Sequence, residues 1–229
     1  MRMKCLWVGV VAAGCAAGAW GQGVGAGAVR EFPAYKLIEG AIDSDGFPTS
    51  GAKLCVVEAP APCFQMPSNL GYSKSGVVYD YGLEPKAERL PMKGGGSLVL
   101  FSATFSGGGS GSLDSLALLR YEGARKFSNL LPFVGLSNQS DRATWSIAEI
   151  SDYPILVTAD FDWMNGETHF AKHFYEVSVY RFDPRLQRYV RVLKYRTSKK
   201  YASLDEADEV RVIQPERQEI MRRLKAAAK

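Results

Sequence analysis

Residues 99–105 read VLFSATF and residues 155–161 read ILVTADF, and the similarity between these two stretches decides the fold. They share Leu, Ala and Phe at identical places, and a Ser in the first stands where the second has Thr. Each is followed by a glycine-containing loop and then by an apolar run, which ends LLRY at residues 118–121 and VYRF at residues 179–182. A small unit of strands used twice explains this pattern. It favours an antiparallel sandwich or a pair of propeller-like blades over a helical or doubly wound fold.

Short apolar runs rich in Val, Tyr, Phe, Leu and Thr fill the middle of the chain, with clusters of Gly, Pro, Asn and Asp between them. This alternation is typical of antiparallel β-strands. The clearest runs are Gly76–Tyr81, Ser97–Phe105, Leu113–Tyr121, Pro154–Phe161, Phe174–Phe182 and Gln187–Tyr195. Asp183 and Pro184 separate the last two runs and predict a hairpin there. Apolar side chains alternate onto both faces of this hairpin, so we expect it to be covered on both sides.

The last residues change character and predict a short C-terminal helix over about 215–226. Pro215 stands where a first helical residue would, acidic residues fall in the first turns, and basic residues fall in the last turns. A narrow apolar stripe at helical spacing would dock this helix on the β-strands: Ile220, Met221 and Leu224. Since 229 residues suffice for one ordinary core, we expect residues 51–229 to form a single β-rich domain that ends in the helix.

Residues 1–21 are typical of a secretory signal peptide. A positive start precedes Cys5–Trp20, an uncharged run of small and apolar residues that is too short for an easy membrane crossing. A lipoprotein signal is the alternative, because small residues precede Cys15, which would then carry the lipid anchor. Residues 22–50 are rich in glycine and turn-forming residues and predict a loose leader. The sequence therefore predicts an exported protein, periplasmic or extracellular, with no transmembrane segment in the mature chain.

The cysteines agree with export. Two of the four, Cys5 and Cys15, lie in the signal segment, so the mature chain keeps Cys55 and Cys63. Their intervening residues include two prolines and suit a turn, which predicts a disulfide. Closing so short a loop contributes about 2.6 kcal/mol in the loop-entropy account. The spacing fits neither C-x-x-C redox chemistry nor the close ligand pairs of zinc sites.

Charge and composition exclude several classes of protein. Lys plus Arg number 28 and Asp plus Glu number 24, a dispersed margin that is too small to indicate a nucleic-acid partner. Hydrophobic residues make up 46% and charged residues 23% of the chain, which excludes a disordered protein and a multispan membrane protein. What remains is a globular body.

The segment GETHFAKH contains both histidines of the chain. On a strand, Glu167, His169 and His173 point to one face, and on a helix the two histidines lie one turn apart. Neutral imidazole and carboxylate are ligands for zinc or another divalent ion, and Asp160 or Asp162 would add a fourth ligand if the loop folds back. The same groups could instead act as general acid and base. The plain alternative is a polar hairpin loop with exposed or hydrogen-bonded histidines. No cofactor is predicted beyond this possible divalent metal.

One resemblance comes from three parts of the sequence. The stretch LSNQS at residues 136–140, Trp145 and the stretch PILVTADF at residues 154–161 resemble, in outline, an uncharacterised family of exported bacterial proteins. The resemblance covers most of the mature chain and implies export and a β-rich fold. It implies no activity, because such proteins have no assigned function.

The absence of a catalytic motif favours a non-enzymatic binding or structural protein of the cell envelope or extracellular space, with an unknown protein or glycan as partner. Aromatic residues that could form its contact surface are Tyr72, Tyr79, Tyr81, Trp145 and Trp163. The alternative is a metal-dependent hydrolase built on Glu167, His169 and His173. Convergence of these side chains with Asp160 or Asp162 in one pocket would favour the hydrolase, whereas an exposed loop would favour the binding protein.

Overall fold

The computed structural model describes residues 29–46, 48–57, 62–73, 76–106, 112–123, 126–132, 134–168, 170–202 and 211–227. The signal segment expected over residues 1–21, including Cys15, lies outside these ranges. Within them the chain is mainly β and antiparallel, with one C-terminal helix, as the sequence predicts.

The elements follow in chain order. They are β1 (Tyr35–Ile38), β2 (Ala41–Ile42), β3 (Pro48–Ser50), β4 (Lys53–Val56), β5 (Cys63–Gln65), β6 (Asn69–Ser73), β7 (Gly76–Asp80), β8 (Glu84–Pro91), β9 (Ser97–Ser106), β10 (Ser112–Gly123), β11 (Lys126–Asn129), β12 (Val134–Ser137), β13 (Asp141–Trp145), β14 (Ile155–Asp162), β15 (Phe174–Asp183), β16 (Arg188–Arg196) and α1 (Ile213–Ala227). The six runs that the sequence marked most clearly correspond to β7, β9, β10, β14, β15 and β16.

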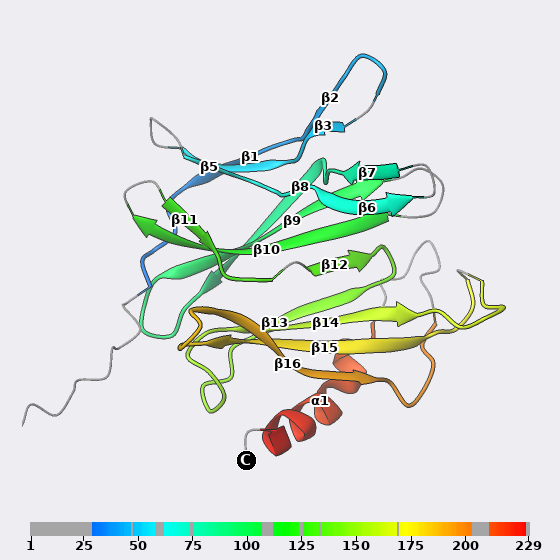
Figure 1. Cartoon of the computed structure of the whole chain (residues 1–229). Helices are drawn as coiled ribbons and strands as arrows, with labels where there is room; N and C mark the ends of the chain where they lie inside the picture. Colours follow the sequence, from blue (N-terminus) through cyan, green and yellow to red (C-terminus); the bar gives the residue numbers. More distant parts are fainter. Residues whose placement is uncertain are drawn as a thin grey trace, which may run out of the picture.

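Two antiparallel four-strand meanders form the body of the molecule (Figure 1). The first has the order β11-β10-β9-β8, with β12 also pairing with β10, and the second has the order β13-β14-β15-β16. VLFSATF lies on β9 and ILVTADF on β14, so each repeated stretch is the second strand of its meander. The following runs, LLRY and VYRF, lie on the third strands, β10 and β15. The predicted repeat therefore occupies equivalent places in the two meanders.

The two meanders pack face to face around a central core. Leu100 and Leu156 hold the same place in the repeat, and both are buried in this core. Their neighbours Phe101 and Val157 are buried in the two outer layers, because successive side chains of a strand point to opposite faces. Neighbouring blades of a propeller pack the front face of one sheet against the back face of the next. Here the equivalent leucines of the two meanders lie in one shared layer, so the same face of each sheet packs inward and the fold is a sandwich.

Each outer face has its own cover, and Figure 1 shows the resulting order of layers. The three-stranded sheet β1-β4-β5 covers the first meander, where Leu54 packs with Phe101. Helix α1 covers the second meander, where Ile220 and Leu224 pack with Val179. The hairpin formed by β15 and β16 is therefore covered on both sides, as its alternation predicts.

The loose leader expected over residues 22–50 is wrong for its later part. Strand β1 pairs with β4, and β2 pairs with β3. Phe32 is buried and stacks on Phe127, with ring centroids 5.6 Å apart. Arg89 forms an ion pair with Glu31 at 2.6 Å. Contacts between residues so distant along the chain leave no local pattern in the sequence. The glycine-rich and turn-rich composition therefore predicted a loose segment where strands form.

The predicted hairpin and disulfide are present. Between β15 and β16, the Asp183 carboxylate accepts hydrogen bonds from the backbone N–H of Arg185 and of Leu186, at 2.8 and 3.1 Å. Cys55 and Cys63 face each other across β4 and β5, and they form a disulfide with Cα atoms 4.0 Å apart. The bridge ties β4 to β5 within the sheet that covers the first meander.

Helix α1 is two residues longer at its start than the sequence predicts and one residue longer at its end. The Asp141 carboxylate accepts hydrogen bonds from the backbone N–H of Val212 and of Ile213, both at 2.8 Å, and so satisfies two donors that a helix start leaves unpaired. Buried Glu216 accepts hydrogen bonds from the hydroxyls of Tyr195 and Tyr201, at 2.9 and 2.5 Å. No helix in the described ranges is long and apolar enough to cross a membrane.

Candidate functional site

The loop between β14 and β15, residues 163–173, contains most of the predicted site and is called the 163–173 loop below. It turns at Gly166, whose φ of 81° favours glycine. The backbone N–H of Glu167 donates to the carbonyl of Met164 at 3.1 Å, and two backbone hydrogen bonds join His173 to Tyr201. His169 lies outside the described residues. The described part of the loop is therefore a tied turn rather than a continuation of the strand.

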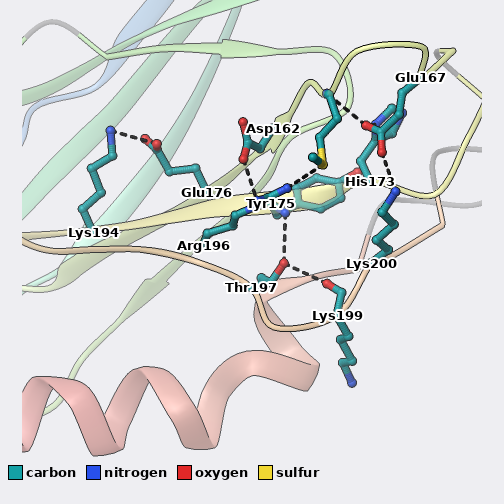
Figure 2. A network of polar contacts seen from close by, with 11 residues as sticks. Asp162, Glu167, His173, Tyr175, Glu176, Lys194, Arg196, Thr197, Lys199 and Lys200 are labelled. Atoms are coloured by element: carbon teal, nitrogen blue, oxygen red, sulfur yellow. Dashed lines mark hydrogen bonds and ion pairs between the residues drawn. The ribbon is translucent and has the colours of Figure 1, made fainter.

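Glu167 anchors the base of this loop (Figure 2). One carboxylate oxygen lies 2.9 Å from Nδ1 of His173, and the other lies 2.5 Å from Nζ of Lys200. The backbone N–H of Met164 also donates to this carboxylate, at 3.2 Å. Hydrogen bonds from Lys200 and then from His173 lower the pKa of Glu167 to about 2. The carboxylate is therefore ionised at neutral pH and fastens the loop to the segment that follows β16.

His173 is fully buried beneath the loop. Because an ionised carboxylate can only accept, Nδ1 carries the proton that is shared with Glu167. The imidazole ring lies 5.3 Å, centroid to centroid, from the rings of Phe161 and Trp163. Its Nε2 has no hydrogen-bond partner among the residues that the structure describes. The histidine thus packs as a core residue and also holds Glu167 in place.

Asp160 and Asp162 do not join this pair. They share one face of β14, and that face is turned toward the first meander, because the Asp160 carboxylate accepts hydrogen bonds from the backbone N–H and hydroxyl of Ser137. Asp162 forms an ion pair with Nε of Arg196 at 3.0 Å (Figure 2). The structure therefore brings Glu167 and His173 together and places the two aspartates elsewhere.

Of the predicted metal ligands, the structure brings Glu167 and His173 together. In the described part of the chain, no group of three or more His, Cys, Asp and Glu side chains could hold a metal ion. The ammonium of Lys200 lies against Glu167 and would repel a cation placed there. Lys200 is 33 residues distant in the sequence, and no spacing rule could have assigned it to this site. The observed chemistry is that of an anchored loop.

Above this polar base, the loop carries three large exposed apolar side chains. The exposed fractions are 47% for Trp163, 44% for Met164 and 79% for Phe170. Trp163 packs edge-on against Phe161 at 4.8 Å, and the sulfur of Met164 accepts a hydrogen bond from Arg196 at 2.8 Å. Two of the three side chains are thus fixed at their bases while part of their surface faces solvent. We call Trp163, Met164 and Phe170 the apolar tip.

Trp145 and Tyr81 give no comparable surface. Trp145 is half-buried, packs against the core beneath α1, and has the guanidinium of Arg217 over its ring at 5.1 Å. Tyr81 is also half-buried. The side chains of Tyr72 and Tyr79 lie outside the part of the chain that can be described. Met164 and Phe170 were missed, although apolar residues in a loop bounded by two strands were the available signal.

The chain matches no protein-family model, no curated protein and no solved structure. The resemblance to exported bacterial proteins therefore stays a prediction.

Proposed function

We propose that this chain is an exported, non-enzymatic binding protein of the cell envelope or extracellular space, and that the apolar tip contacts a partner protein. The observation that carries the proposal is the exposure of Trp163, Met164 and Phe170 on one short loop with an ordered base. Large apolar side chains gathered on a surface are typical of interaction sites.

The composition and the anchoring of the tip both suit protein binding. Aromatic residues and methionine are enriched in the cores of protein interfaces, and tryptophan is among the residues that contribute most to binding free energy. Binding also requires loops to be ordered, which costs free energy. Glu167, His173 and Lys200 already hold the base of the loop, so less of this cost remains to be met on association.

Export is the second part of the proposal. The disulfide between Cys55 and Cys63 supports it, because such bonds persist in oxidising compartments and are rare in the cytosol. The basic and apolar character of residues 1–21 supports it from the sequence. A lipid anchor at Cys15 is the alternative to a soluble exported form.

The test is a photo-crosslinking experiment in the source cell. A photoreactive phenylalanine analogue replaces Phe170 in one variant and Leu186 in a control variant, since Leu186 is an exposed apolar residue in the hairpin at the other end of β15. We expect a discrete protein adduct from position 170 and not from position 186. The double variant Trp163→Ser and Met164→Ser should weaken it. A glycan adduct, or no adduct from a folded protein, would contradict the proposed partner.

A metal-dependent hydrolase is the second candidate. The observation that favours it is the buried Nε2 of His173, which has no hydrogen-bond partner among the described residues. The contact of Lys200 with Glu167 disfavours it. We expect elemental analysis after dialysis without chelator to find no stoichiometric divalent metal. Stoichiometric metal that is lost in His169→Ala and in His173→Ala would replace the binding proposal with the hydrolase.

A further inference from the structure

A cleft of about 580 Å³ lies at the end of the sandwich opposite the 163–173 loop. Four segments that are distant in the sequence line it: Val29 before β1, the turn between β8 and β9, the loop before β14, and the hairpin of β15 and β16. Its volume falls within the range of small-molecule sites, which is roughly 300–1,000 Å³. Residues 174–180 of β15 separate the cleft from the loop.

The apolar surface beside the cations of the cleft comes mainly from aliphatic side chains. Tyr153 and Phe182 belong to the lining, but they stack on each other with ring centroids 3.9 Å apart and are each only 5% exposed. They face the central core, on the side of β15 opposite to Arg181. Ile150 and Val190 are half-buried members of the lining, and Val190 is the cross-strand partner of Arg181. An apolar group bound near Arg181 would therefore contact these aliphatic side chains.

The cleft is also lined by cations that form no ion pair with the described residues. Lys93, Arg181 and Arg185 line it, and none of these three side chains forms an ion pair within 4.0 Å with any residue that the structure describes. Arg181 is half-buried, whereas Lys93 and Arg185 are exposed.

Two carboxylates share the lining and could in principle neutralise these cations. Asp183 is already engaged, because it accepts backbone hydrogen bonds from the turn of the hairpin. Asp152 is exposed and forms no ion pair with another described residue. The lining thus keeps an excess of one positive charge, three cations against two carboxylates, and the cation that is partly withdrawn from water is Arg181.

We propose that this cleft binds a small organic carboxylate with an apolar body. The guanidinium of Arg181 receives the carboxylate in a two-pronged hydrogen-bonded pair, and the apolar body lies against Ile150 and Val190. Lys93, on the turn between β8 and β9, adds a second positive charge at the rim. This site is independent of the apolar tip.

The test uses 2-naphthoate as the probe and 2-naphthalenemethanol as its neutral counterpart, both titrated into the purified protein by calorimetry. We expect one-to-one binding of the naphthoate and at least about tenfold weaker binding of the alcohol, because hydrogen bonds to charged groups are the strong ones. Arg181→Gln should weaken naphthoate binding by about tenfold or more, and Lys93→Gln by a smaller factor. Arg191→Gln is the matched control, because Arg191 is exposed and lies outside the lining.

Three results would overturn the proposal: no naphthoate binding at millimolar concentration, equal affinity for the two probes, or equal affinity in the Arg181→Gln variant with its circular dichroism unchanged. Lys93 is exposed, so its variant tests the charge requirement even if Arg181→Gln fails to fold. Naphthoate binding should persist in Trp163→Ser. A failure of the cleft therefore leaves the proposed role of the apolar tip untouched, and the reverse also holds.

Discussion

Replacing Leu156 by alanine tests whether the two meanders share one core. Leu156 is only 2% exposed, and alanine lacks the equivalent of three methylene groups, each worth about 0.8 kcal/mol of burial. The lost transfer free energy is therefore about 2.4 kcal/mol, and the cavity left behind raises the expected loss to about 3–4 kcal/mol. Leu100 occupies the equivalent place in the same layer, so Leu100→Ala should lose a similar amount.

The assay is equilibrium unfolding in urea, followed by far-ultraviolet circular dichroism and by tryptophan fluorescence. We expect one transition, coincident by both probes, because the central core joins the two meanders into one cooperative unit. Leu186→Ala is the control, since Leu186 is half exposed in the hairpin turn and should change the free energy of unfolding by less than about 0.5 kcal/mol.

Two results would refute the reasoning. One is a loss below about 1 kcal/mol in either the Leu100 or the Leu156 variant, since a fully packed leucine in a core costs more than that to truncate. The other is a resolved second transition in the wild type, which would show that each meander unfolds alone. Either result would remove the shared central layer from the description of the fold.

Three further predictions concern the site and the cover sheet. The pKa of Glu167 is about 2 in the folded protein, which is lower than its unfolded value. The contribution of Glu167 to loop anchoring is therefore complete above the ordinary carboxyl range and is lost as the pH falls toward 2. Carbon NMR of the Glu167 carboxyl group should show this midpoint, and Lys200→Ala should raise it. The double variant Cys55→Ser and Cys63→Ser should lower the free energy of unfolding by about 2.6 kcal/mol in urea, and no change would show that the bridge is not a structural staple. Glu216→Ala should cost about 2–3 kcal/mol, because two tyrosine hydroxyls lose their acceptor, whereas Glu216→Gln should cost less; equal losses would exclude this explanation.

Most of the fold was predictable because its strands have local signatures. Alternation, turn residues and the repeated stretch mark β9, β10 and β14 to β16, and Pro215 with the charges around it marks α1. The cover sheet was less predictable. Strand β1 is short, and it is held by pairing with β4 and by the burial of Phe32 against residues far along the chain. Such partners become visible only once the chain has folded.

The candidate site was predictable only in part. The sequence placed Glu167 and His173 together, and the structure agrees, because after the turn at Gly166 the Glu167 carboxylate lies 2.9 Å from Nδ1 of His173. It also offered Asp160 as a possible ligand, but the period of two along β14 turns that carboxylate to the other face. Lys200 completes the anchor from beyond β16, and the cleft is assembled from four separate segments. Neither arrangement leaves a pattern that can be recognised in the sequence.

The shared central layer limits how many meanders can pack on one another. When two like faces bind each other, the contact is self-complementary and closes after two units, so no third meander can be added at the centre. Only the outer faces would remain open to further stacking, and they are built from apolar side chains such as Phe101 and Val179. The N-terminal strands and the C-terminal helix therefore act as end caps that keep a duplicated, stackable unit from polymerising.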